Sequence, residues 1–279
     1  MPELALALAS YTTSWDTTSV KVILSGEGAD ELFAGYPKHQ VEARVGHFPT
    51  PAITAIGAGL AALTAVAPAR MRRLRIAGRA LWQGNRRARM VSWFGALTPA
   101  ERDTYWTSPH PKMTHDTNHF ATTHGATALR RAMHFDQTSY LPDNQLDSLD
   151  MMTMAASLEA RTPFLDIRLA EFAARLPDNW LIAGLATKRI VREALGPSLP
   201  INVVKRRKKG FSLPVAQWFR GPLGAEFRDR VLSPAAVCSD FLDQHRIARL
   251  ADEHYEGQVN HDKTLWTFFA LETFLGEFF

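Results

Sequence analysis

The chain has 279 residues, of which 46% are hydrophobic and 22% charged, a composition typical of a globular protein with a large core. Its length favours one large domain and is compatible with two, and its net charge of +4 suits nucleotides and nucleic acid alike, so the charge decides little. The single cysteine, Cys238, excludes a disulfide framework within the chain and, with no basic secretory start, indicates a cytoplasmic protein.

The first clear element is a β-branched apolar run at residues 20–24, which predicts a buried strand. The segment SGEGADE follows at residues 25–31 and leads into a predicted helix, an order typical of an α/β nucleotide site. Its glycines let backbone N–H groups approach an anion, and its acids Glu27, Asp30 and Glu31 suit a Mg²⁺ ion that bridges to phosphates. From composition alone, the plainer alternative of a glycine-rich turn with solvated acids is favoured, since short glycine motifs are common.

The next part of the chain, residues 40–125, is rich in Ala and Arg and reads as several helices with irregular joints. The uncharged stretch at residues 51–68 carries a proline at each end and predicts a buried or amphipathic helix rather than a membrane span. His115 and His119 have the spacing of a metal pair on a helix, but no acidic or cysteine ligand completes the set, so no metal is expected there.

Residues 136–166 give a firmer pattern. We expect Pro142 to open a helix that reaches Arg161 and stops at Pro163. We also expect Glu159, Arg161 and Asp166 to form an ion-pair network at the turn, with a pocket for an amino-acid substrate as the functional alternative. The apolar positions of the predicted helix face are Leu146, Leu149, Met152, Met154 and Leu158.

The C-terminal part predicts four further helices and a basic turn. Five consecutive basic residues at 205–209 precede Gly210 and Pro214, which favours an ordered turn whose lysine could reach an anionic intermediate or leaving group. Only one strand is clear in the whole chain, so its partners lie outside the chain or are not apparent from the pattern. The predicted helices are residues 169–176, 187–195, 214–219 and the terminal core helix 263–279.

Five of these segments, in this order and spacing, resemble the asparagine synthase family. The resemblance covers most of the chain and is thin between residues 48 and 127. The matching segments are VILSGEGADELFAGYPKH (22–39), YLPDNQL (140–146), MAASLEARTPFLD (154–166), TKRIVREAL (187–195) and RRKKGFSLPVAQWFRGPL (206–223).

The resemblance implies an α/β fold that is predominantly helical in this chain. Residues 1–279 would form the C-terminal portion of an adenine-nucleotide α-hydrolase-like (HUP) synthetase domain that is truncated at its N-terminus. It also implies that ATP and Mg²⁺ activate the side chain of aspartate as an acyl-adenylate, which is attacked by ammonia that a separate N-terminal domain releases from glutamine. The chain would then be a carbon–nitrogen ligase of asparagine biosynthesis.

The same resemblance implies roles for individual residues. Asp30 would ligate Mg²⁺ and Glu27 would stand near the reacting centre, while Lys188 and Lys208 would lie near the phosphates and the intermediate. The implied catalytic residues are therefore Glu27, Lys188 and Lys208. The implied nucleotide-binding residues are Ser25, Gly26, Glu27, Gly28 and Asp30.

The sequence also departs from the family pattern. It contains neither the SGGxDS-type pyrophosphate loop nor a glutaminase domain, so a separate chain carrying both is an expected partner. The chain alone is expected neither to hydrolyse glutamine nor to make asparagine at a useful rate. Around Asp150 the family commonly has a Lys and an Arg, whereas this chain has Ser148 and Met151.

Two alternatives therefore stay open. One is an amide-forming ligase of specialised metabolism, like the β-lactam synthetases, and the other is an inactive remnant that serves as a scaffold. Nucleic-acid binding is disfavoured, because the basic run at 205–209 is explained by the family motif.

Overall fold

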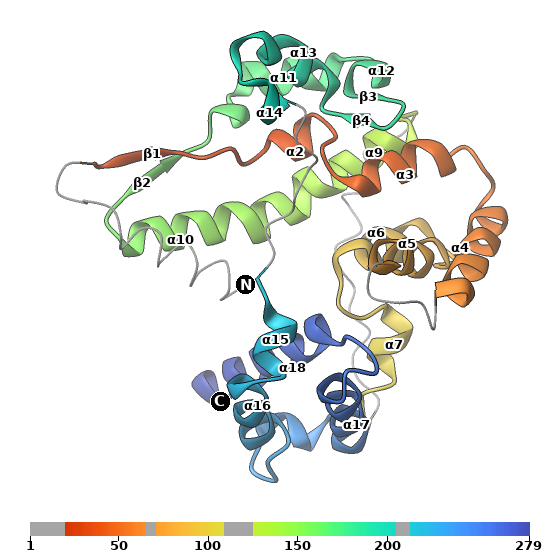
Figure 1. Cartoon of the computed structure of the whole chain (residues 1–279), viewed down its shortest axis with the longest axis vertical. Helices are drawn as coiled ribbons and strands as arrows, with labels where there is room; N and C mark the ends of the chain where they lie inside the picture. Colours follow the sequence, from red (N-terminus) through yellow and green to blue (C-terminus); the bar gives the residue numbers. More distant parts are fainter. Residues whose placement is uncertain (1–19, 65–70, 109–124, 205–212) are drawn as a thin grey trace. The chain divides into compact units, whose positions relative to one another are not determined.

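The computed structural model of this protein describes residues 20–64, 71–108, 125–204 and 213–279. The chain divides into two compact units, which we describe separately. Unit 1 comprises residues 1–49 and 115–209, and unit 2 comprises residues 50–114 and 210–279. Most of the described residues are helical, and the strands are few and short (Figure 1).

The strand predicted near residue 22 is confirmed, and its partner comes from a segment that we expected to be helical. Strand β1 (Val22–Leu24) pairs in parallel with β2 (Glu159–Arg161), and Figure 1 shows the two side by side. The predicted helix through Arg161 was wrong, because Ser157 takes a left-handed conformation with a φ of 56° and turns the chain into β2. The expectation of a buried strand was also wrong, since Val22 is 49% exposed.

One long helix runs along the base of unit 1 and is continuous in Figure 1. It consists of α9 (Ala128–Phe135), the π-helical segment η2 (Asp136–Leu146) and α10 (Asp147–Ala155). Its start is set by Thr127, whose hydroxyl accepts a hydrogen bond from the backbone N–H of Arg130. Pro142 therefore lies inside this helix, and the prediction that it opens one was wrong.

The predicted apolar face of this helix is confirmed only in part. Leu149 and Leu158 are buried, whereas Met154 is exposed to solvent. Met154 lies just before the end of α10 at Ala155, where the chain is about to leave the helix. A regular helical period therefore overestimates how many of these side chains reach the core.

The remaining elements of unit 1 are short, and two of them confirm the helices predicted at 169–176 and 187–195. They are α2 (Ala29–Leu32), α3 (Pro37–Val45), η3 (Pro163–Leu165), α11 (Ile167–Arg175), α12 (Asp178–Leu181), β3 (Ile182–Ala183), β4 (Ala186–Thr187), α13 (Arg189–Leu195), η4 (Gly196–Ser198) and α14 (Ile201–Val204). Strands β3 and β4 pair antiparallel. The core of the unit packs the end of α2 against α9, α11 and α12 through Leu32, Phe33, Ala34, Leu129, Met133, Ala173 and Leu181.

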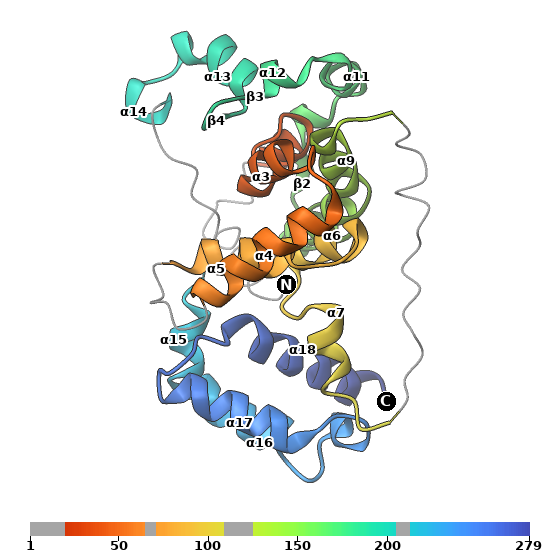
Figure 2. The ribbon, with the colours of Figure 1, turned by 90° about the vertical axis from the view of Figure 1, so that its right-hand side faces the viewer.

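Unit 2 is helical around an aromatic core. Its elements are α4 (Thr50–Thr64), α5 (Arg72–Leu81), α6 (Arg86–Phe94), α7 (Pro99–Asp103), α15 (Val215–Phe219), α16 (Pro222–Val231), η5 (Val237–Asp240), α17 (Gln244–Tyr255) and α18 (Asp262–Phe278). The terminal helix α18 packs against α15, α16 and α17, as Figure 2 shows, and buries Leu265 and Phe268. The predicted helices at 214–219 and 263–279 are confirmed.

Helices α4 and α5 approach each other closely through glycine. A Cβ atom added to Gly57 would lie 2.2 Å from the backbone nitrogen of Trp82, and one added to Gly78 would lie 2.7 Å from that of Ala61. The helix predicted within 51–68 is thus confirmed over the described residues up to Thr64, as one half of a tight helical pair. None of the described helices is both long and apolar enough to cross a membrane.

This close contact leads to a first prediction. Gly57→Ala should lower the free energy of unfolding by about 1–3 kcal/mol, because the new methyl group meets backbone atoms that cannot move away independently. Gly59→Ala, on the exposed side of the same helix with no atom within 4 Å of the new Cβ, should instead raise it by up to about 1 kcal/mol. Urea unfolding followed by circular dichroism measures both; equal stabilities of the two variants would contradict the packing described.

Candidate functional site

The glycine loop at residues 25–28 leaves β1 at the point where the sheet ends. The backbone N–H of Ser25 donates to the carbonyl of Arg161 at 2.8 Å, which prolongs the pairing of the two strands. The Ser25 hydroxyl then accepts a hydrogen bond from the N–H of Glu27 at 3.4 Å. Gly28 has a φ of 86°, so a residue without a side chain suits the turn into α2. At Gly26 an added Cβ would meet no atom within 4 Å, so this part of the loop has room for a ligand.

Asp30 and Lys188 meet next to this loop. Asp30 lies in the first turn of α2, and its Oδ1 atom forms an ion pair of 2.9 Å with Lys188 Nζ. Both side chains are largely buried, with 15% and 23% exposed. Lys188 precedes α13 and has a φ of 52°, a left-handed conformation that costs about 1 kcal/mol or more for a residue other than glycine. Two of the residues singled out in the sequence are thus brought together, one of them in a strained conformation.

Gly35 makes room for this ion pair and is a site residue that the sequence analysis missed. A Cβ atom at this position would lie 1.7 Å from Asp30 Oδ1 and 2.4 Å from Lys188 Cε. The backbone N–H of Gly35 also donates to the carbonyl of Asp30 at 2.8 Å. The sequence gives no signal for this role, because residues 32–36 were expected to be helical until Pro37; that expectation was wrong, since α2 ends at Leu32.

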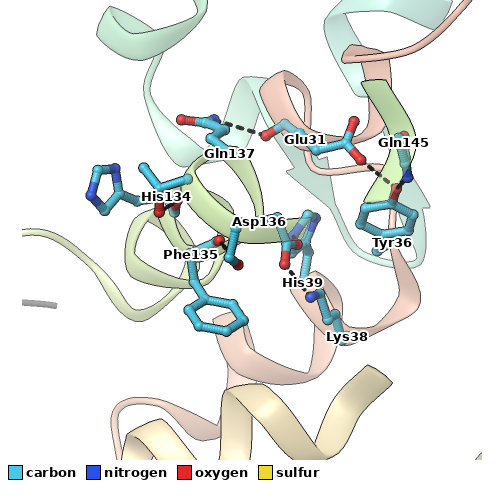
Figure 3. A network of polar contacts seen from close by, with 11 residues as sticks. Glu31, Tyr36, Lys38, His39, His134, Phe135, Asp136, Gln137 and Gln145 are labelled. Carbon is cyan, nitrogen blue, oxygen red and sulfur yellow. Dashed lines mark hydrogen bonds and ion pairs between the residues drawn. The ribbon is translucent and has the colours of Figure 1, made fainter. Parts of the chain in front are cut away.

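A polar network lies beneath the loop and is drawn in Figure 3. The hydroxyl of Tyr36 donates to the carboxyl group of Glu31, and Gln145 Nε2 donates to the Tyr36 hydroxyl oxygen at 2.6 Å. Gln137 Nε2 donates to the backbone carbonyl of Glu31 at 2.9 Å. Glu31 is only 1% exposed, and this burial raises the pKa of its carboxyl group. Among the three acids of the SGEGADE segment, Glu31 therefore faces the protein interior. The alternative in which this carboxyl group is exposed to solvent is wrong.

A second group of contacts also joins η2 to the segment that follows the glycine loop. Asp136, at the start of η2, is fully buried, and its carboxylate contacts Lys38 Nζ and, at 2.7 Å, His39 Nε2. Burial lowers the pKa of Lys38 to about 8, although the neighbouring Asp136 favours the charged form. No local pattern in the sequence predicts this group, because Asp136 lies close to a hundred positions from Lys38 and His39.

The ion pairs expected around the turn at 159–166 form only in part. Arg161 contacts Glu159 at 2.7 Å, with both side chains exposed. Asp166 instead pairs with Arg168 and accepts a hydrogen bond from the backbone N–H of Arg168 at 3.0 Å. These contacts lower the pKa of the Asp166 carboxyl group. Asp166 therefore begins α11 as its cap and is not part of a larger network.

The remaining positions singled out in the sequence are either on α10 or outside the described residues. Ser148 is buried on α10 and Met151 is exposed. The histidines at 115 and 119 and the basic run at 205–209, with Lys208, lie outside the described residues.

The residues near the loop fit a metal only in combination with phosphate. Nowhere in the described ranges is there a group of three or more His, Cys, Asp or Glu side chains that could hold an ion. Asp30 could supply one carboxylate oxygen, and Mg²⁺ is commonly bound by one or two carboxylates with phosphate oxygens and water. The donor set therefore suits an ion that arrives with a nucleotide, and the oxygen of Asp30 that could bind it is the one paired with Lys188.

Comparisons with known proteins agree with one another. The family model described as asparagine synthase matches residues 6–276. A "Putative asparagine synthetase (glutamine-hydrolyzing)" of Mycobacterium tuberculosis is 32% identical over 257 residues, which are 89% of this chain and 38% of that protein. "Asparagine synthetase (glutamine-hydrolyzing) 1" of Bacillus subtilis is 25% identical over 258 residues, which are 89% of this chain and 39% of that protein. The chain thus spans about two fifths of the length of these relatives.

The buried Asp136 leads to a second prediction. Asp136→Asn should lower the free energy of unfolding by about 3–5 kcal/mol at neutral pH, because it leaves the buried cation of Lys38 without its counter-charge. Asp147→Asn, at an exposed position further along the same helix, should change it by no more than about 0.5 kcal/mol. Urea unfolding of the two variants and the parent provides the measurement. Equal stabilities would mean that the buried pair contributes nothing to the fold.

Proposed function

We propose that this chain, which belongs to the asparagine synthase family, takes part in the ATP-dependent amidation of aspartate through an acyl-adenylate in asparagine biosynthesis. The family consists of glutamine-dependent asparagine synthetases, which are ATP-dependent ligases. In this proposal residues 1–279 are the C-terminal portion of a HUP-type synthetase domain. Its substrates are aspartate, ATP and ammonia derived from glutamine, and a separate chain is the candidate source of a glutaminase domain and pyrophosphate loop.

The observation that carries the proposal is the ion pair of Asp30 with Lys188 beside the glycine loop. A mobile ammonium group next to a loop with free space suits the phosphates of a nucleotide. The same pair supports a site where charge develops during transfer, since a carboxylate that can hold a cation and a lysine that can neutralise phosphate stand within contact distance.

Each residue has a proposed role in the reaction. The backbone of Ser25, Gly26, Glu27 and Gly28 binds the nucleotide, with Glu27 near the reacting carboxyl group. Asp30 ligates Mg²⁺, which when bound neutralises charge on the phosphates. Lys188 moves its ammonium group from Asp30 to the phosphate oxygens, and Lys208 stabilises the intermediate and the leaving group.

A second candidate concerns the substrate and rests on α10. Ser148 and Met151 stand beside Asp150 where the family commonly has basic residues, so the side chains that would hold the second carboxylate of aspartate are missing there. This favours, as the alternative, an amide-forming ligase of specialised metabolism with a less acidic substrate.

The ion pair leads to a third prediction, which tests the function. The protein combined with the expected partner that carries the pyrophosphate loop, and given ATP, Mg²⁺, aspartate and ammonia, should form pyrophosphate and asparagine, whereas the chain alone should form neither at a useful rate. Asp30→Asn should lower this turnover by roughly a hundredfold, because the charge at the phosphates is lost. Gly35→Ala should have a similar effect, because its methyl group displaces both members of the pair. Pyrophosphate release and amino-acid analysis provide the measurement.

The control for Gly35→Ala is Gly196→Ala in the same unit, where the added Cβ only touches Val204 at 3.6 Å. That variant should keep its turnover. Normal turnover of Asp30→Asn would refute the metal assignment. Turnover with another carboxylic acid but not with aspartate would establish the alternative substrate class.

A fourth prediction concerns the basic turn, which lies outside the described residues. Lys208→Ala should lower synthesis by roughly a hundredfold, as expected for a charge placed at a transition state. Lys205→Ala should have little effect, since this lysine precedes the matching segment. Steady-state assays of both variants provide the measurement. Equal losses would indicate a diffuse basic patch and would favour nucleic-acid binding.

A further inference from the structure

We propose that the π-helical segment η2 is a positioning element for Asp30, and that it acts through Gln145 and Tyr36. The catalytic part of this inference rests on the function proposed above, while the structural part stands on the contacts alone. The contacts of η2 with the segment 31–39 form a clamp, made by Asp136, Gln137 and Gln145 on η2 (Figure 3).

The clamp holds the chain after the glycine loop at both of its ends. Asp136 binds Lys38 and His39 at the start of α3. Gln145 binds the hydroxyl of Tyr36, which in turn binds the Glu31 side chain in α2. The turn between α2 and α3 is therefore held from one side by a single helix.

The π-helical form explains how one helix can do this. Asp136 and Gln145 are nine positions apart. At about 3.6 residues per turn, nine residues make about two and a half turns, which would place the two side chains on opposite faces. A π-helical turn takes up roughly one residue more, so nine residues make about two turns and both side chains return to one face. The hydrogen bond from the N–H of Asp147 to the carbonyl of Pro142, five residues back, belongs to this wider winding.

The clamp reaches Asp30 through its immediate neighbours. Gln137 holds the backbone carbonyl of Glu31 at 2.9 Å, and the N–H of Gly35 holds the carbonyl of Asp30 at 2.8 Å. The backbone on both sides of Asp30 is thus fixed, while its side chain points to Lys188. Gln145 acts on Asp30 through Tyr36, Glu31 and the intervening backbone, so Tyr36 and Gln145 are positioning residues.

Two mild variants test the inference. Gln145→Ala removes the donor to Tyr36, and Tyr36→Phe removes the hydroxyl while keeping the ring, which packs against His39 and Tyr140. Asn144→Ala is the matched control, since this neighbouring amide on η2 makes no hydrogen bond with the described residues. Each variant is examined by amide hydrogen exchange and, together with the partner carrying the pyrophosphate loop, by steady-state kinetics of pyrophosphate formation.

The expected result has two parts. Amide exchange across residues 29–36 should become at least about tenfold faster in Gln145→Ala and Tyr36→Phe, with the rest of unit 1 unchanged. The kcat for pyrophosphate formation should fall by about tenfold to a hundredfold while the KM for ATP stays within about threefold, because the misplaced Asp30 affects the transition state more than binding. Asn144→Ala should match the parent in both measurements.

The two readouts separate failure of this inference from failure of the proposed function. A parent protein that shows no aspartate-dependent turnover in the presence of the partner carrying the pyrophosphate loop would refute the function, and the exchange data would still decide whether η2 positions residues 29–36. Unchanged exchange in both variants would overturn the inference. Faster exchange throughout unit 1, or equal changes in kcat and KM, would overturn it as well, because they indicate a general structural role.

Discussion

The buried carboxylate of Asp136 is the contact on which the arrangement of unit 1 depends. Its partners Lys38 and His39 lie close to a hundred positions earlier in the chain, and all three side chains are almost fully buried. An unpaired charge buried at this place would lower the free energy of unfolding strongly, so the fold depends on all three side chains being in contact. Because Lys38 follows the glycine loop so closely, fixing α3 on η2 also fixes where that loop ends. The Asp136 carboxylate favours the charged form of Lys38, although burial lowers the pKa of the Lys38 side chain.

Local patterns predicted the elements whose cause is local. The apolar run at β1 and the helices α11, α13, α15 and α18 were found from propensity and from Gly and Pro signals. The strand β2 was not, because its extended form depends on pairing with β1 far along the chain and on the left-handed turn at Ser157. Pro142 lies inside a π-helical segment, whereas a proline usually begins or ends a helix, so the helix start predicted at this residue was wrong.

The residues of the candidate site likewise divide into those that the sequence indicated and those that depend on contacts between distant parts of the chain. The resemblance to a family pointed to Asp30 and Lys188, and the fold brings these two into contact. Gly35 and Gln145 carry no such signal, because their roles consist of leaving room and of reaching across to another element. Neither role can be read from a residue type: a glycine near a helix end and a glutamine on a helix are common in sequences without any site. The roles of Gly35 and Gln145 become apparent only once β1, α2 and η2 are placed relative to each other.

Burial separates the two kinds of contact at this site. The contacts of Asp136 with Lys38 and His39 are removed from solvent, where hydrogen bonds and ion pairs are strong and difficult to break, while Gln137 and Gln145 are half-buried. The pair of Asp30 and Lys188 is 15% and 23% exposed, and in the proposed function its two partners exchange for a metal and a phosphate. Lys188 also has a left-handed backbone conformation, which costs about 1 kcal/mol or more for a residue other than glycine. In the proposed site, the contacts of η2 hold the segment that follows the glycine loop, while the pair of Asp30 and Lys188 beside the loop can change partners. The wider winding of η2 brings these holding contacts onto one face of a single helix.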